Sequence, residues 1–262
     1  MLTYETIDTP DSPKVAAYTK LPERKLSEVR ESFVAEGETV LKVALSSPEF
    51  EVLSMFMSER QSKRLGPLLE ESGVDVPVYI AHQDVMDAVV GFNIHRGTLA
   101  VVRRRSVPSL SEAIASGTGH VIVAMGIANH DNIGGIFRNA AAFGASCVLL
   151  DESSCHPFYR KAVRVSVGGV MRVPFVRTAA PSRMFEALAA AGIEPLTLSP
   201  NAERELSDIP RGKRYALVVG TEGPGLDAHW LKAGTPTSIR MKPGFDSLNV
   251  AQTVGIALYA LG

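Results

Sequence analysis

Three short polar segments carry the residue types of this chain that could bind and transform a ligand. Asn132 follows an apolar run and is itself followed six residues later by Arg138. Glu222 lies inside a glycine-rich turn, and Ser247 and Asn249 precede a helix rich in Ala, Val and Leu. Ligands of open α/β sheets collect at the C-terminal ends of strands. We therefore expect the three segments to form one shared site.

The last of these segments also offers a physical reason to bind a polar group. Residues 239–241 are predicted to form a short strand, and a loop containing Gly244 leads from it to Ser247 and Asn249. The first turn of a helix leaves its N–H groups unpaired, so the start of this helix could receive a polar ligand. Ordinary capping of the helix by Ser247 or Asn249 is the alternative interpretation.

The three segments together resemble the motifs of the SpoU/TrmH family of SPOUT methyltransferases. The first motif is met by Asn132, Gly134 and Arg138. The second is met by Gly220, Glu222, Gly225 and Leu226. The third is met by Ile239, Gly244, Ser247, Leu248 and Asn249. Each motif alone is weak, whereas all three in order are a strong sign of the family, over roughly residues 110–262.

The resemblance implies an enzyme that transfers a methyl group from S-adenosylmethionine to a ribose 2′-hydroxyl of RNA, without a metal. It also implies an α/β fold whose C-terminal parallel-sheet domain closes in a deep trefoil knot, and a homodimer whose active sites are completed across the interface. The implied catalytic residues are Asn132, Arg138, Glu222, Ser247 and Asn249. The implied cofactor-binding residues are Leu198, Gly220, Glu222, Gly223, Ile239, Met241, Ser247 and Leu248.

Two roles stay open for Arg138. The family implies that it accepts the proton of the 2′-hydroxyl, but arginine has a pKa above about 12 and gives up its own proton with difficulty. Alternatively, Arg138 grips a phosphate and stabilises the developing alkoxide. Asn132 is expected to orient the ribose or Arg138, and Glu222 to hold Arg138 or the cofactor.

The charge distribution is compatible with RNA binding, although the net charge is only −1. No acidic residue lies between Glu152 and Glu186, and this stretch contains Arg160, Lys161 and Arg164. Local positive charge is what contacts to a phosphate backbone require. We therefore expect these three residues to contact RNA, with a merely solvated basic surface as the alternative.

The chain is predicted to form two domains with a boundary near Pro108. Residues 1–107 alternate between strand and helix patterns and resemble the small, ribosomal-protein-like RNA substrate-binding domain of several SpoU members. Within them we expect a loose or extended leader over residues 1–14 and a helical pattern over residues 26–46. Residues 108–262 form the expected methyltransferase domain.

Composition limits the remaining choices. Two cysteines, Cys147 and Cys155, provide neither a disulfide framework nor a metal pattern. No apolar run is long enough to span a bilayer and no signal pattern begins the chain, so a cytoplasmic protein is expected. The resemblance to the SpoU/TrmH family implies ribosomal RNA rather than tRNA as substrate, because the short tRNA enzymes of that family generally lack this kind of N-terminal domain. A non-catalytic RNA-binding module on the same scaffold is the alternative of a different class.

Overall fold

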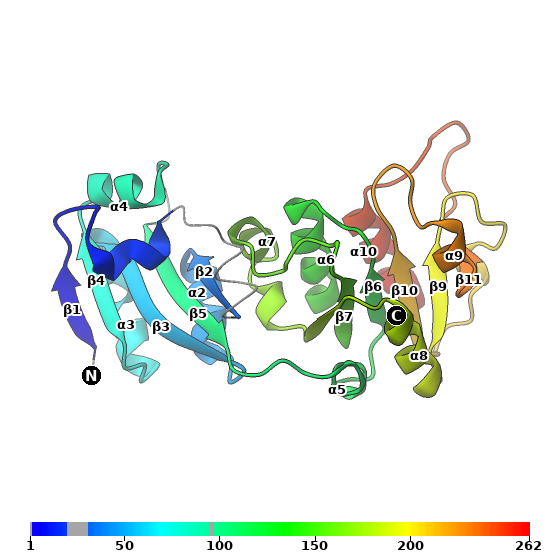
Figure 1. Ribbon diagram of the computed structural model, residues 1–262, viewed down its shortest axis with the longest axis horizontal. Coiled ribbons are helices and arrows are strands. Elements are labelled where there is room, and N and C mark those ends of the chain that lie inside the picture. The colour runs from blue at the N-terminus through cyan, green and yellow to red at the C-terminus, as the bar shows by residue number, and fades with distance from the viewer. Residues whose placement is uncertain (1, 20–30, 95–96) are drawn as a thin grey trace. The chain divides into compact units, whose positions relative to one another are not determined.

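The structure, a computed structural model, folds into two compact units (Figure 1). It describes residues 2–19, 31–94 and 97–262. Unit 1 comprises residues 1–106 and 158–171, and unit 2 comprises residues 107–157 and 172–262. The chain thus leaves the first unit near the predicted boundary but returns to it once. Across the described residues, every helix is too short or too polar to cross a membrane.

Unit 1 is built on a mixed five-stranded sheet. Its strands are β1 (Thr3–Thr6), β2 (Ser32–Glu36), β3 (Phe50–Ser58), β4 (Pro77–Ala81) and β5 (Thr98–Arg104). Its helices are η1 (Pro13–Tyr18), α2 (Glu38–Ser46), α3 (Glu59–Glu71), α4 (Gln83–Val90), α7 (Arg160–Val165) and η2 (Gly169–Met171). The strand order is β1-β4-β3-β5-β2, in which β4 is parallel to β1 and β3 while β5 is antiparallel to β2 and β3.

One expectation for unit 1 was wrong. Residues 32–36 form strand β2, where the helical pattern was expected, because all five residues are buried and paired with β5. Gly37 then turns the chain into α2 with φ of 89°. The leader, expected to be loose or extended, contains the extended strand β1, which pairs with β4. The part of the expected helix over residues 26–30 lies outside the described residues.

The return of the chain to unit 1 corrects the predicted domain assignment of residues 158–171. Phe158 stacks on Phe33 of β2 with ring centroids 4.5 Å apart, and its ring is almost fully buried. Ala162 and Val163 of α7 are also buried, and α7 packs against β2. The hydrophobic side chains of residues 158–171 therefore complete the core of unit 1. The residues before and after this segment in the sequence belong to unit 2.

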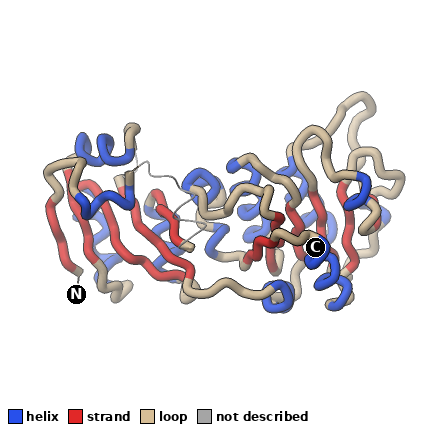
Figure 2. Tube along the Cα trace, in the orientation of Figure 1, coloured by secondary structure: helices blue, strands red, loops and turns tan. Residues whose placement is uncertain are grey.

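Unit 2 is a parallel α/β structure, as predicted, and Figure 2 shows its strands and helices. Its strands are β6 (Val121–Ala124), β7 (Cys147–Asp151), β8 (Phe175–Thr178), β9 (Glu194–Leu198), β10 (Tyr215–Val219) and β11 (Thr235–Thr237). Its helices are α5 (Leu110–Ala115), α6 (His130–Ala142), α8 (Ser182–Ala190), η3 (Leu206–Asp208), α9 (Ala228–Leu231) and α10 (Val250–Leu261). The strand order is β11-β9-β10-β6-β7-β8, with every pair parallel.

The two central strands explain how this sheet is covered. Every residue of β6 and β10 is buried, as expected for parallel strands with helices on both faces. One core cluster joins Val121 and Val123 of β6 to Met184 and Leu188 of α8. The β6–α6–β7 and β8–α8–β9 crossovers run in opposite directions along the sheet, so right-handed connections place α6 and α8 on opposite faces. Helix α10 packs against α6.

Candidate active site

A pocket of unit 2 lies where β9 and β10 end and α10 begins, and has a volume of about 390 Å³. Its walls come from three loops, which follow β9, β10 and β11. The lining residues include every predicted cofactor-binding residue, namely Leu198, Gly220, Glu222, Gly223, Ile239, Met241, Ser247 and Leu248. Asn249, Val250 and Thr253 add the first turn of α10. The second and third motifs therefore meet at one edge of the sheet, as predicted.

The glycine-rich turn after β10 depends on one close backbone approach. A Cβ atom on Gly220 would lie 2.4 Å from the backbone nitrogen of Leu226 and 2.5 Å from the carbonyl carbon of Gly225. Only glycine fits there without moving the backbone. Gly223 and Gly225 have φ of 87° and 72°, values that favour glycine in the same turn. The turn thus folds back on the end of β10 and holds Glu222 at the edge of the pocket.

Three side chains from distant parts of the sequence form a hydrogen-bonded cluster at this edge. Asn132 donates from Nδ2 to Oε1 of Glu222. Asn249 donates from Nδ2 to Oδ1 of Asn132 at 2.8 Å and, more weakly, to Oε1 of Glu222 at 3.5 Å. Asn132 is buried, whereas Glu222 and Asn249 are exposed. Glu222 is held by the two amides, and the expected pairing of Glu222 with Arg138 is not what the structure contains.

Asn249 also begins α10, which corrects the expectation of free amides at this helix start. Its Oδ1 accepts hydrogen bonds from the N–H groups of Ala251 at 2.9 Å and Gln252 at 3.3 Å. These donors are therefore occupied by the N-cap of the helix itself. Asn249 consequently uses its carbonyl oxygen for the helix and its amide nitrogen for the cluster.

The helix that carries Asn132 is fixed against α10 by small residues. A Cβ atom on Gly135 would lie 2.7 Å from the Cβ of Ala251, and one on Gly255 would lie 2.9 Å from Nδ2 of Asn139. Asn139 donates from Nδ2 to the carbonyl oxygen of Ala251 at 2.6 Å. The close contact of α6 and α10 thus sets the distance between Asn132 and Asn249.

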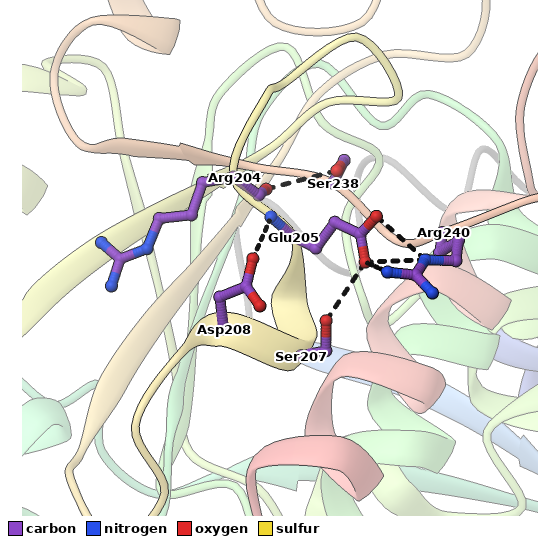
Figure 3. Close-up of polar contacts among 6 residues, drawn as sticks. All are labelled: Arg204, Glu205, Ser207, Asp208, Ser238 and Arg240. Carbon is purple, nitrogen blue, oxygen red and sulfur yellow. Dashed lines mark hydrogen bonds and ion pairs between the residues drawn. The ribbon is translucent and has the colours of Figure 1, made fainter.

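A second set of contacts joins the loops that follow β9 and β11 (Figure 3). Leu206 and Ser238 pair through the backbone, with the Leu206 N–H donating to the Ser238 carbonyl at 2.7 Å and the Ser238 N–H donating to the Arg204 carbonyl at 2.8 Å. Beside them, Arg240 donates to both carboxylate oxygens of Glu205 at 2.9 Å. This hydrogen bond, in which Arg240 donates and Glu205 accepts, lowers the pKa of Glu205 and raises the pKa of Arg240.

The predicted strand over residues 239–241 is wrong. Strand β11 ends at Thr237, and Ile239 and Met241 lie in the irregular segment after it, where both line the pocket. The chain is held there by the Glu205–Arg240 pair and by the backbone bonds of Ser238 to the preceding loop. Residues 239–241 are therefore a loop that follows the edge strand β11.

Residues 119–259 match the SpoU rRNA Methylase family, which is more than half of the chain. The chain belongs to the SpoU rRNA methylase family. It is 38% identical over 232 residues to an uncharacterized tRNA/rRNA methyltransferase of Mycobacterium bovis, covering 86% of this chain and 79% of that protein.

Two further comparisons extend over nearly the whole chain. A 23S rRNA guanosine 2′-O-methyltransferase of Bacillus subtilis is 27% identical over 256 residues, which cover 97% of this chain and 98% of that protein. The crystal structure of an rRNA methyltransferase from Sinorhizobium meliloti with bound AdoMet superposes with a TM-score of 0.80 at 22% identity, covering 98% and 97% of the two chains. The likeness to this solved structure shows that both units share its fold.

Arg138 of the first SpoU motif takes a separate position. It is exposed on α6, and a separation of six residues places it about 240° around the helix from Asn132. In the described part of the chain it lines no wall of the pocket and forms no hydrogen bond or ion pair. The structure thus brings Asn132, Glu222, Ser247 and Asn249 together at one pocket and leaves Arg138 outside it.

The three residues predicted to contact RNA differ in their surroundings. Arg160 is largely buried, donates to the buried carboxylate of Glu36 at 3.0 Å, and lies over the ring of Phe92 at 4.8 Å. Arg164 lies 3.6 Å from the same carboxylate and is more exposed, and Lys161 is exposed. Sequence reasoning missed Glu36 because it lies 124 residues before Arg160.

Proposed function

We propose that this SpoU family member transfers a methyl group from S-adenosylmethionine to a ribose 2′-hydroxyl of ribosomal RNA. The observation that carries the proposal is that the second and third motifs meet in one pocket, where Asn132 of the first motif is hydrogen-bonded to Glu222. The rRNA substrate is supported by the Bacillus subtilis relative, which is named for methylation of a 23S rRNA guanosine at the 2′-oxygen.

The residues of the pocket suit S-adenosylmethionine. Its volume of about 390 Å³ falls within the usual range for small-molecule sites of about 300–1,000 Å³. Leu198, Ile239 and Leu248 supply apolar walls, and the turn at Gly220 allows close approach to backbone groups. The bound cofactor would supply a methyl group activated by a sulfonium cation. Glu222 adds a carboxylate at the pocket edge that would attract this cation.

We propose that the Asn132–Glu222–Asn249 cluster positions the ribose beside the methyl group. Both amides donate toward Oε1 of Glu222, which holds the carboxylate in one orientation. Ser247 lines the same wall and can bond to a ribose hydroxyl. The 2′-hydroxyl must lose its proton as it attacks, and Arg138 either accepts that proton or grips a phosphate and stabilises the alkoxide.

We further propose a homodimer in which Arg138 reaches the pocket of the partner copy. Arg138 lies outside the pocket of its own chain. Large exposed apolar side chains on α10 and at the end of α6 are suited to a contact between copies, namely Phe143, Ile256 and Tyr259. A monomer at micromolar concentration in analytical ultracentrifugation would contradict this part of the proposal.

The deep trefoil knot is likewise proposed. Its support is the family and the way the segment after β11 pairs with the loop after β9 before α10 returns to α6. A crystallographic trace in which the C-terminal segment passes through no earlier loop would contradict it.

We propose that unit 1 binds the RNA, with Lys161 and Arg164 at its surface contacting phosphates and Arg160 contributing from a less exposed position. Each phosphate contact adds to the salt dependence of binding. Arg164→Ala should therefore weaken RNA binding and flatten its dependence on salt concentration. An unchanged slope would remove Arg164 from the interface.

The first experiment is calorimetric titration with S-adenosylmethionine and S-adenosylhomocysteine. Binding in the micromolar range is expected for a pocket of this kind. A folded protein that binds neither compound, alone or with rRNA present, would favour a non-catalytic RNA-binding module on the same scaffold.

A further inference from the structure

The turn that connects the two pocket-lining parts of the third motif has a defined conformation. Pro243 and Gly244 occupy its centre, Gly244 has φ of 86°, and the Phe245 N–H donates to the Lys242 carbonyl at 3.3 Å. Proline followed by a residue with positive φ, closed by a bond of this kind, is a type II turn. The turn therefore presents Lys242 and Phe245 on a preorganised support, directly beside Met241 and Ser247 of the pocket wall.

Phe245 is an unusually exposed aromatic residue. Its exposed fraction is 66%, exceeded among the large hydrophobic residues described only by the 74% of Tyr259. Tyr259 packs against Phe143 at 6.2 Å, whereas the ring of Phe245 stacks on no other aromatic ring of the described residues. Packing within the chain therefore does not explain a phenylalanine at this position, whereas contact with a ligand would explain it.

The chemistry of the turn identifies the class of ligand. Lys242 is exposed three residues before Phe245, so that a cation and a free aromatic face belong to one turn. This combination binds single-stranded nucleic acid, in which the cation contacts the backbone and the ring stacks on a base. A ribose whose 2′-hydroxyl enters the adjacent pocket brings its base close to this turn, and the unstacked bases of single-stranded RNA stack on aromatic side chains.

We propose that Phe245 stacks on an unstacked RNA base next to the methylated ribose and that Lys242 contacts the adjoining phosphate. The inference rests on the proposed RNA methyltransferase function and deepens it. The adenine of the cofactor is the alternative group that could stack on the Phe245 ring. RNA is favoured because Met241 and Ser247 line the pocket whereas the residues between them, including Phe245, do not.

Steady-state methylation of deproteinised 23S rRNA tests the proposal with three variants. Phe245→Ala should raise KM for RNA by about ten-fold, as loss of one stacked base does, with a smaller change in kcat and an unchanged Kd for S-adenosylmethionine. Phe245→Leu keeps the apolar bulk but lacks the π face, so it should behave like alanine, while Phe245→Tyr should stay near wild type. A leucine variant with wild-type KM would overturn stacking.

A fluorescence experiment separates the two possible occupants. Phe245→Trp is placed in a Trp230→Phe background, which removes the single native tryptophan. Stacking on a base should quench the new tryptophan when 23S rRNA is added, and S-adenosylmethionine alone should not. Quenching by the cofactor alone, or none with RNA, would overturn the inference. Because this measures binding, it remains decisive if the wild-type protein proves unable to methylate RNA, a result that would refute the proposed function separately.

Discussion

Asn249 allows its two structural roles to be separated by substitution. Its Oδ1 caps α10 at Ala251 and Gln252, and its Nδ2 joins the cluster of Asn132 and Glu222. Asn249→Ala removes both roles. Asn249→Asp keeps a good N-cap but removes the Nδ2 donor and sets a second carboxylate beside Glu222.

The structure sets the magnitude of each effect. Loss of an N-cap costs about 1 kcal/mol of stability, and loss of the 2.8 Å hydrogen bond from Asn249 to Asn132 costs about another 1 kcal/mol. Asn249→Ala should therefore destabilise unit 2 by about 2 kcal/mol, or lower its Tm by about 4–8 °C. Asn249→Asp should cost about half as much, because α10 stays capped.

The assay combines thermal unfolding with S-adenosylmethionine binding and methyl transfer. Both variants should lose most methyl transfer, although only the alanine variant loses the cap. Equal losses of Tm would show that the cap does not contribute as argued. Full methyl transfer by Asn249→Asp would refute the assignment of the cluster to the active site.

Three other predictions concern separate parts of unit 2. Mixing inactive Arg138→Ala and Glu222→Ala proteins should restore roughly a quarter of wild-type activity, because half of randomly formed dimers are mixed and one of their two sites is intact. Absence of any recovery, despite subunit exchange, would mean that Arg138 serves its own chain. Arg240→Ala should weaken S-adenosylmethionine binding by a few-fold, and the exchange of charges with Glu205→Arg and Arg240→Glu should recover part of it. An unchanged Kd in Arg240→Ala would show that this pair does not position the pocket loops. Burial lowers the pKa of His120 below its usual 6.5, so the stability from its neutral form is present above pH 6.5 and lost as pH falls toward the lowered pKa. Wild-type Tm should thus fall more than that of His120→Gln between pH 7.5 and about pH 5, and parallel curves would contradict this origin.

The parallel unit was predictable because its signals are local. The uninterrupted apolar runs that became β6 and β10 indicate strands covered on both faces, and the polar residues after them indicate the site edge. Asn249 caps α10, which is the alternative interpretation that the sequence allowed for this helix start. The pocket followed, because parallel strands bring their C-terminal ends to one edge.

The predictions that were wrong concern features that depend on contacts between residues distant in sequence. The run at 33–36 fits either a strand or a helix, and pairing with β5 selects the strand. Arg160 lies in an acid-free stretch, yet its carboxylate partner Glu36 comes from another part of unit 1. Phe158 and α7 join unit 1 because Phe158 stacks on Phe33, which no local pattern shows.

The most direct test of the central claim is to incubate the purified protein with S-adenosylmethionine and 23S rRNA from a strain lacking its gene, and to digest the RNA to nucleosides for mass spectrometry. The account predicts one new 2′-O-methylated nucleoside, absent when Asn249→Asp replaces the wild-type protein. A methyl group on a base instead of the ribose, or no methyl group despite cofactor binding, would contradict it.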